Sequence, residues 1–166
     1  MNVSEVLEAR KTLKEFHYEI TPLERGYTDK SLHIDVGSKE ITIKDIPALV
    51  KEKFIGGKGY GLKFLWDATT PDTKWNDPEN EIVISGGPIC GITQYSGTGK
   101  SLVVTISPQT DSAMDSNVGA WFGPFIKICG IDAIELQGIA EKEVLVLIDG
   151  RNGGTIRIEE APADPI

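Results

Sequence analysis

The N-terminal segment has apolar residues at helical spacing. Between residues 3 and 18, charged side chains separate an apolar stripe formed by Val6, Leu7, Leu13 and Phe16. This spacing predicts an amphipathic helix, whose single stripe serves either for packing against its own domain or for docking against another subunit. A proline and a glycine then end the pattern. We therefore expect residues 1–30 to form a helical extension in front of a domain at residues 31–166.

Residues 31–46 alternate between apolar and polar side chains on both sides of a Gly-Ser turn. A period of two residues predicts a β-hairpin. Pro47 begins a segment with helical spacing that ends at Gly56 or Gly57, and a second helix is expected after Lys58. This part of the chain is thus predicted to add two short helices to a pair of strands.

Short apolar runs predict that the rest of the chain is mainly β-strand. Strands are expected at 82–84 and 102–107, and residues 107–130 are expected to begin as a polar loop and to end as a short helix. Three more strands are predicted, the last two joined by a turn at residues 152–154, at 132–137, 143–149 and 154–160. Because hairpins pair antiparallel strands, the sequence predicts a β-rich α+β fold with mostly antiparallel pairing.

The composition is that of an ordinary globular protein with an acidic balance. The 166 residues are enough for one domain with its own core, and the formal net charge is −8. Nucleic acids and anionic membranes require a basic face, so neither is expected as a partner. The sequence shows no apolar signal core and no apolar run as long as a membrane span. The chain is therefore expected to be cytoplasmic.

Few residues suit metal binding or acid–base catalysis. Cys90 and Cys129 lie in apolar segments and are expected to be free, buried thiols. His17 and His33 lack the spacing of a metal site and are expected to be ordinary surface or strand residues. Most of the 25 acidic residues lie in charge-rich surface segments, and no Ser-His-Asp or Cys-His arrangement is evident. We expect no catalytic residue in this chain.

The segment GITQYSGTGKSLVVTIS, residues 91–107, contains the letters GTGKS and looks like a nucleotide-binding loop. A P-loop of the form GxxxxGK[S/T] would need glycine where the chain has Gln94, and it would continue as a helix. The β-branched run after Ser101 predicts a strand instead. Nucleotide binding is therefore the weakest functional hypothesis, and a lack of saturable ATP or GTP binding would remove it.

Three glycine-rich loops, at residues 54–61, 85–101 and 115–123, each carry a strong polar side chain. These side chains are Lys58, Lys100 and Asn117. Glycine alone is weak evidence, because any turn-rich domain needs its special backbone angles. Three such loops together indicate an anionic, phosphate-bearing ligand that is bound by backbone N–H groups and lysines.

Three segments follow one another in a fixed order: FIGGKGYG, then DPENEIVISGGPICGITQYSGTGKSLVVTISPQT, then DSNVGAWFGPFIKICGIDAIELQGIAEKEVLVLID. This ordered set resembles the N-terminal domain of the tungsten- or molybdenum-dependent aldehyde ferredoxin oxidoreductase family. The resemblance extends from about Ser31 to Glu160. It implies a base of two β-sheets on which a bis-molybdopterin cofactor with tungsten or molybdenum lies.

The resemblance assigns cofactor contacts to the two lysine-bearing loops. Lys100, next to Gly99, matches the basic residue that contacts the pterin and its phosphates, which is usually an arginine in the family. Lysine is a point charge without the planar, bidentate geometry of arginine, so a weaker contact is expected. Lys58, between Gly57 and Gly59, matches a further basic loop beside the same cofactor.

The third loop matches the family motif NxGxxFG. Asn117 corresponds to the asparagine whose backbone carbonyl helps to bind the magnesium ion between the pterin phosphates. Val118, Gly119 and Ala120 match the backbone segment that lies against the pterin. The resemblance therefore implies a magnesium ion in addition to the bis-molybdopterin metal centre.

Other parts of such an enzyme are not found in this sequence. The family binds an iron–sulfur cluster through a CxxCxxxC set and a later cysteine, whereas this chain has two cysteines. The resemblance implies a separate subunit or a fragment that needs a partner chain or partner domains to oxidise an aldehyde to a carboxylate, with ferredoxin as the electron partner. The alternative is a non-catalytic pterin-binding or assembly module with the same fold. The substrate and the choice between tungsten and molybdenum stay open.

Overall fold

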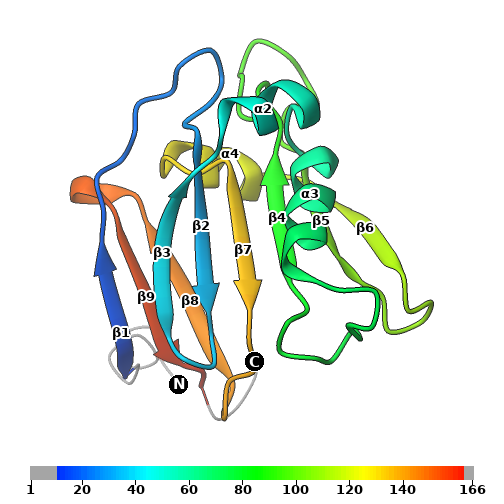
Figure 1. Cartoon of the computed structure of the whole chain (residues 1–166). Coiled ribbons are helices and arrows are strands. Elements are labelled where there is room, and N and C mark those ends of the chain that lie inside the picture. Colours follow the sequence, from blue (N-terminus) through cyan, green and yellow to red (C-terminus); the bar gives the residue numbers. More distant parts are fainter. Residues whose placement is uncertain (1–10, 163–166) are drawn as a thin grey trace.

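The computed structural model describes residues 11–162, which form two β-sheets and three short α-helices (Figure 1). The smaller sheet has three antiparallel strands in the order β1-β9-β8. Their bounds are Thr12–His17 for β1, Val144–Asp149 for β8 and Thr155–Glu160 for β9. The predicted α+β fold class is confirmed, and so is the hairpin of the last two strands, whose turn contains a short 3-10 segment at Arg151–Gly153.

The larger sheet has six strands in the order β3-β2-β7-β4-β5-β6. Five of them coincide with predicted strands: β2 at Lys30–Asp35, β3 at Glu40–Asp45, β4 at Ile82–Gly86, β5 at Ser101–Ile106 and β7 at Ala133–Gln137. Strands β2 and β7 are parallel, and the other neighbouring pairs are antiparallel. The prediction of mostly antiparallel pairing is therefore confirmed.

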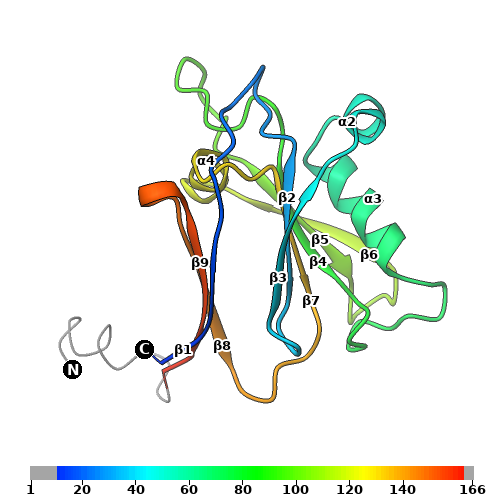
Figure 2. The same cartoon turned by 60° about the vertical axis from the view of Figure 1, so that its left-hand side comes forward.

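The two sheets face each other and enclose the main apolar core (Figure 2). Alternate strand residues point into it, among them Leu32, Ile34, Ile134, Ile156 and Ile158. The opposite face of the larger sheet is covered over β4 and β5 by α3, Lys58–Ala68, which follows α2, Ala48–Phe54. Both helices were expected from their spacing. None of the helices between residues 11 and 162 combines the length and apolar character that crossing a bilayer requires.

The prediction of an N-terminal amphipathic helix is wrong for residues 12–17, which form strand β1 and pair with β9. The residues of that predicted helix before position 11 lie outside the described part of the chain. Leu13 and Phe16 are three residues apart, as in a helix, but a register shift between Thr12 and Lys14 lets both pack against the core between the sheets. A β-bulge thus produces in a strand the spacing that is typical of a helix.

A second correction concerns β6, Ala113–Val118, which the sequence predicted as part of a polar loop. This strand pairs with β5 alone and forms an edge of the larger sheet. Most of its side chains are exposed, so it lacks the apolar alternation of a strand that covers a core. Its backbone pairing with β5 is what makes it a strand, and sequence periodicity does not report that pairing.

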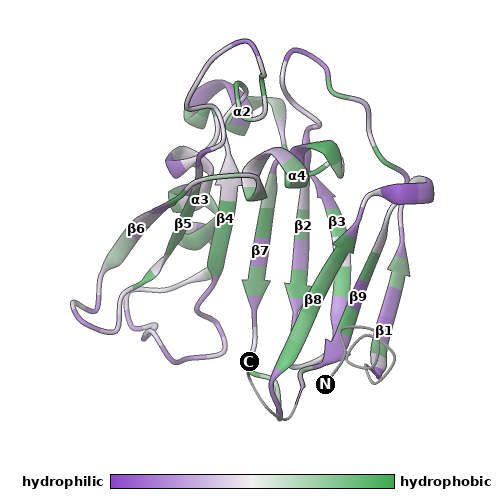
Figure 3. Ribbon diagram, turned by 180° about the vertical axis from the view of Figure 1, so that it is seen from behind, coloured by the Kyte–Doolittle hydropathy of each residue, from purple (hydrophilic) through white to green (hydrophobic). Residues whose placement is uncertain are grey.

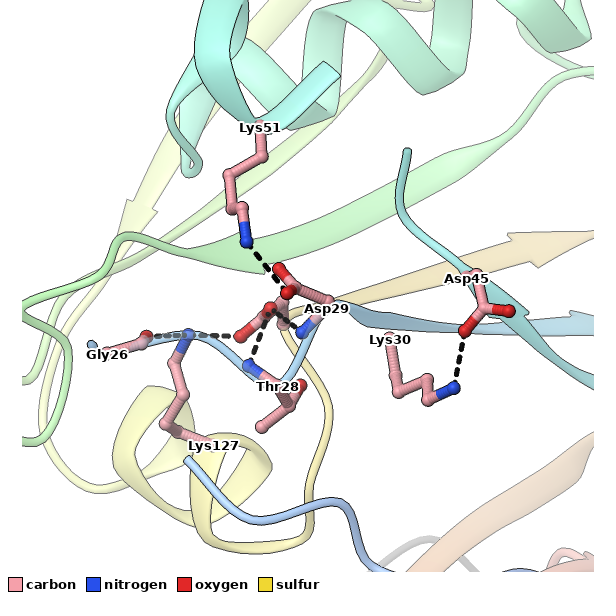
Figure 4. A network of polar contacts seen from close by, with 8 residues as sticks. Gly26, Thr28, Asp29, Lys30, Asp45, Lys51 and Lys127 are labelled. Atoms are coloured by element: carbon pink, nitrogen blue, oxygen red, sulfur yellow. Dashed lines mark hydrogen bonds and ion pairs between the residues drawn. The ribbon is translucent and has the colours of Figure 1, made fainter. Parts of the chain in front are cut away.

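A buried ion pair fixes α4, Phe122–Ile128, to the start of β7 (Figure 4). Lys127 of this predicted helix pairs with Asp132, and its ammonium donates a hydrogen bond to the Gly26 carbonyl at 3.1 Å. The second carboxylate oxygen of Asp132 accepts hydrogen bonds from the N–H groups of Thr28, at 3.0 Å, and Asp29, at 2.8 Å. Buried charges are tolerated when they are paired and hydrogen-bonded in this way. The network holds α4 and the loop before β2 at the same end of the sheets.

Candidate functional site

The three glycine-rich loops meet at one end of the larger sheet, where β4 and β6 end and β5 begins (Figure 1). The N–H group of Gly57 donates a hydrogen bond to the Gly86 carbonyl at 2.9 Å, which joins the first loop to the second. Gly99 lies against Ala120, because a Cβ atom on Gly99 would be 2.4 Å from the Ala120 carbonyl oxygen. The structure therefore brings together the loops that the sequence selected.

Cys90 lies at the centre of this junction. Its thiol donates a weak hydrogen bond to the Lys100 carbonyl, with Sγ 3.6 Å from the oxygen. A Cβ atom on Gly123 would be 2.8 Å from Sγ and one on Gly86 would be 3.1 Å away, so these two glycines make room for the thiol. Burial raises the pKa of the Cys90 thiol. Cys90 is thus the free, buried thiol that was predicted, whereas Cys129 is free and half-buried.

The GTGKS segment does not have the geometry of a P-loop. Lys100 is followed at once by strand β5, not by a helix. Ser101 would bind the metal ion of a nucleotide in a P-loop, but here it is fully buried. A Cβ atom on Gly123 would be 3.4 Å from the Ser101 Cβ, so the serine packs against this glycine. The predicted strand after the lysine is confirmed, and the sequence likeness to a P-loop has no counterpart in the fold.

Lys100, Gly119 and Ala120 form a small site with free hydrogen-bond donors, which we name the donor site. The Lys100 side chain is exposed and has no acidic partner within residues 11–162. A Cβ atom on Gly119 would meet only the Lys100 Nζ, at 3.7 Å. In the described chain the N–H groups of Gly119 and Ala120 donate no hydrogen bond. A cation beside two free N–H groups is a suitable arrangement for an oxyanion.

Lys58 differs from Lys100 because its charge is already paired. Its Nζ lies 2.5 Å from Oδ1 of Asp115 on β6. The neighbouring glycines also have structural roles: Gly57 has a φ of +52°, and a Cβ atom on Gly59 would be 2.1 Å from the Phe54 carbonyl oxygen. Lys58, the first residue of α3, therefore carries a cation that is already shared with Asp115.

Asn117 and Val118 lie in the last part of β6, opposite Leu102 and Ser101. Asn117 is exposed, and its strand forms the edge of the sheet. A Cβ atom on Gly57 would be 3.9 Å from the Leu102 side chain, so the first loop reaches the same pair of strands. The role of the Asn117 carbonyl in binding magnesium stays a prediction.

Hydrophobic residues occur along α4 (Figure 3), and several apolar side chains of α4 and the adjacent loops are exposed. We name this set the apolar surface; it consists of Ile89, Tyr95, Trp121, Phe122, Phe125 and Ile128. Trp121 is 68% exposed and stacks on Phe125 with ring centroids 6.1 Å apart. Large exposed apolar patches on a soluble domain mark sites of contact with other protein segments or ligands.

A family model described as the N-terminal domain of aldehyde ferredoxin oxidoreductase matches residues 31–163. The chain belongs to this family. The tungsten-containing aldehyde ferredoxin oxidoreductase of Pyrococcus horikoshii is 31% identical over 127 residues, which cover 76% of this chain and 21% of the relative. β1 lies before the matched segment but contributes a strand to the smaller sheet of this aldehyde ferredoxin oxidoreductase domain.

Two further relatives of this aldehyde ferredoxin oxidoreductase domain have other names. The aliphatic sulfonate oxidoreductase, WOR-like subunit, of Pyrococcus furiosus is 29% identical over 139 residues, covering 82% of this chain and 21% of the relative. The active-site complex BamBC of benzoyl coenzyme A reductase, solved with 1,5-dienoyl-CoA, has a chain that superposes with a TM-score of 0.74 at 29% identity. That match covers 80% of this chain and 20% of the solved one. The chain thus spans about a fifth of the length of these relatives.

Sequence reasoning missed two features of this aldehyde ferredoxin oxidoreductase domain. Asp115 was treated as one of many surface carboxylates, although it pairs with Lys58. Glu81 and Glu135 were treated in the same way, although both are buried. A signal for Glu135 exists in the segment AIELQ, where a glutamate stands in the middle of a strand between apolar neighbours. No comparable signal exists for Asp115, because its partner Lys58, at the start of α3, is more than fifty residues away in the chain.

Proposed function

We propose that this chain is the cofactor-cradling domain or subunit of a tungsten- or molybdenum-pterin oxidoreductase. The complete enzyme oxidises an aldehyde to a carboxylate and passes the electrons through an iron–sulfur cluster on other domains to ferredoxin. Membership of the aldehyde ferredoxin oxidoreductase family supports this proposal, as does a relative that is named as tungsten-containing. The task of this chain is to bind and orient the cofactor, and the bound metal centre supplies the redox chemistry.

The single observation that carries the proposal is the donor site. The Lys100 ammonium and the free N–H groups of Gly119 and Ala120 suit the phosphate groups of a pterin cofactor, because each can donate to a phosphate oxygen without losing an existing partner. Val118 and Gly119 provide backbone against which a pterin ring can lie, since a Cβ atom on Gly119 would meet no backbone within 4 Å. The Asn117 carbonyl would bind the magnesium ion.

The apolar surface supports the need for partner domains or a partner chain. Six large apolar side chains on α4 and in the second and third glycine-rich loops are exposed within the described chain. These relatives are about five times longer than the matched segment, which covers 21% of the Pyrococcus horikoshii protein. Further protein of that size, placed over the apolar surface, would remove it from water and enclose the cofactor between the two parts.

The oxidoreductase proposal is tested by isolating the native complex. We expect the chain to purify with a partner that carries the iron–sulfur cluster, and the complex to contain tungsten or molybdenum, magnesium and iron. Elemental analysis by mass spectrometry measures these metals. A chain that purifies from its native host alone, monomeric and free of all three would contradict the proposal.

The role of Lys100 is tested in the assembled complex. We expect Lys100→Ala to weaken cofactor retention by about 1.5–3 kcal/mol, the contribution of a hydrogen bond to a charged group. Lys74→Ala is the matched control, because Lys74 is an exposed lysine in the loop between α3 and β4. Equal tungsten or molybdenum content in the two variants would show that Lys100 does not hold the cofactor.

The alternative is a non-catalytic pterin-binding or assembly module with the same fold. The pairing of Lys58 with Asp115 favours it, because it leaves fewer free cations than a permanent site for a doubly phosphorylated cofactor would use. Calorimetric titration of the 166-residue chain with a molybdopterin precursor separates the two functions. Tight binding by the chain without any partner supports the module, whereas binding only in the complex supports the oxidoreductase subunit.

A further inference from the structure

A hollow of about 480 Å³ lies on the larger sheet, beside α3 and over β2, β3 and β7. It is on the face opposite the main core, because His33 and Glu135 alternate with Leu32, Ile34 and Ile134, which point into that core. α3 covers β4 and β5 but leaves this part of the sheet open (Figure 1). The hollow is separate from the donor site, which lies where β5 begins and β6 ends.

Two buried carboxylates that line the hollow have oxygens without hydrogen-bond partners among the described residues. The Glu81 side chain, just before β4, is 2% exposed, and its Oε2 has no partner in the described residues. Oε1 of Glu135 on β7 also has none there. Burial, together with the negative charge of Glu135, raises the pKa of Glu81 to about 8. A buried carboxylate of this kind is stabilised by a positive group close to it.

The positive groups of the protein itself satisfy the two carboxylates only in part. Lys44 on β3 lies 3.5 Å from Oε2 of Glu135, and its side chain is 45% exposed. His33 Nε2 is 4.0 Å from Oε1 of Glu81, which is beyond hydrogen-bond range, and 3.4 Å from the Gln137 amide oxygen. Glu81 is therefore left without a close cationic partner.

The rim of the hollow adds negative charge and apolar surface. Asp45 and Asp67 line it, and each is paired with a lysine outside the hollow, Lys30 and Lys63 respectively. Apolar walls come from Ile46, Pro47, Phe64 and Ala68. Carboxylates below apolar and aromatic walls suit a cation that carries carbon atoms, because the ring face of phenylalanine also attracts positive charge.

We propose that this hollow binds a small organic cation, whose ammonium or guanidinium group replaces Lys44 beside Glu135 and pairs with Glu81. A bare metal ion fits less well, since no group of three or more ligating side chains exists within residues 11–162. The volume also exceeds what a single ion needs by an order of magnitude. The bound cation stabilises the ionised form of Glu81, so binding releases a proton wherever Glu81 was protonated.

The test is an NMR titration of the 166-residue chain with methylguanidinium, which stays charged at every pH used. We expect saturable amide shifts at His33, Lys44 and Glu135. N-methylurea has nearly the same shape and no charge, and it should produce no saturable shift. The absence of saturable shifts with methylguanidinium, or equal binding of both probes, overturns the proposal.

Two variants should change the affinity for methylguanidinium in opposite directions if the hollow is a cation site. Glu81→Gln should weaken methylguanidinium binding by roughly tenfold to a hundredfold, as expected for one hydrogen bond to a charged group. Lys44→Met should tighten binding, because it removes the competing cation. Both variants keep the size of the side chain, and near-native amide spectra verify the fold. Unchanged affinity in both variants contradicts the proposed contacts.

The pH dependence supplies an independent readout. Glu81 is faced by His33 from β2, Lys44 from β3, Glu135 from β7 and Asp67 from α3. Because the free protein protonates Glu81 below about pH 8, the affinity for methylguanidinium should rise with pH up to that value and then level off. The Glu81→Gln variant should lose most of this rise. Tighter binding of zinc or manganese than of methylguanidinium at the same residues would identify a metal site instead and overturn the proposal.

Discussion

Asp132, just before β7, and Glu135, in the middle of β7, stand three residues apart and are both buried, yet their surroundings differ. Asp132 pairs with Lys127 and accepts hydrogen bonds from two backbone N–H groups (Figure 4). Glu135 shares its region with a second carboxylate, Glu81, and each has an oxygen without a partner among residues 11–162. Both carboxylate oxygens of Asp132 thus have partners, whereas Glu81 and Glu135 together form a cluster that is incomplete.

The difference separates structural polar groups from candidate functional ones. A complete buried network holds elements in place, since removing any member leaves a charge or a donor unsatisfied. An incomplete one remains sensitive to pH and to ligands, because a proton or an external cation can supply what the fold does not. We expect substitutions in the two clusters to change the free energy of unfolding by amounts that differ in sign as well as in size.

The largest effect is expected for Lys127→Met, which leaves Asp132 as a buried charge without its cation. The free energy of unfolding should fall by about 3–5 kcal/mol, as when one partner of a buried ion pair is removed. Urea unfolding followed by circular dichroism measures this loss. Adding Asp132→Leu should restore only part of it, because the N–H groups of Thr28 and Asp29 then lose their acceptor. A loss below 1 kcal/mol would make the network dispensable and would remove the contrast with Glu81.

Glu81→Gln should raise the free energy of unfolding at high pH, whereas Lys127→Met lowers it. The folded chain keeps the Glu81 proton up to about pH 8, whereas the unfolded chain loses it near pH 4.5. Between these values the unfolded state binds fewer protons, so the contribution of Glu81 to stability is present at low pH and is lost as the pH rises. The variant should match the wild type near pH 5 and exceed it by an amount on the order of 2–4 kcal/mol near pH 9.

The measurement for Glu81 is urea unfolding of both proteins across this pH range. The difference between the two curves isolates Glu81 from the other titrating groups. Curves that run parallel from pH 5 to pH 9 would show that Glu81 has the same pKa in the folded and unfolded chain. Its burial would then have no electrostatic consequence, and the two clusters would not differ in the proposed way.

The distinction between complete and open surroundings also applies to Gly99, which precedes Lys100, and to Gly119 of the donor site. Gly99→Ala should destabilise the fold by about 1–3 kcal/mol, because its Cβ would lie 2.4 Å from the Ala120 carbonyl oxygen. Gly119→Ala should cost less, since its Cβ would meet only the flexible Lys100 side chain at 3.7 Å. In the assembled complex Gly119→Ala should instead lower the tungsten or molybdenum content. Equal thermal stability of the two variants would contradict this assignment.

Sequence periodicity predicted the elements that alternate or repeat around a core, such as the hairpin of β2 and β3 and the helix α3. It failed where pairing with another segment decides the structure. Leu13 and Phe16 have helical spacing but lie in a bulged strand. β6 is an edge strand that is held by its backbone pairing with β5, and most of its side chains are exposed, so it lacks an apolar alternation. The glycine loops were found, because glycine and lysine leave a local signature. The pairing of Lys58 with Asp115 and the burial of Glu81 depend on distant contacts, so no local pattern reveals them.

The smallest effect is expected for Lys30→Ala, which removes an ion pair at the surface. Lys30 and Asp45 face each other across β2 and β3 beside the buried network, and the Asp45 side chain is 83% exposed (Figure 4). Water solvates both charges in the folded and the unfolded chain, so the loss should be under about 1 kcal/mol and should shrink further at high salt. Urea unfolding at low and high ionic strength measures it. A loss as large as that of Lys127→Met would mean that proximity of opposite charges, and not complete burial and hydrogen bonding, decides what these lysines contribute.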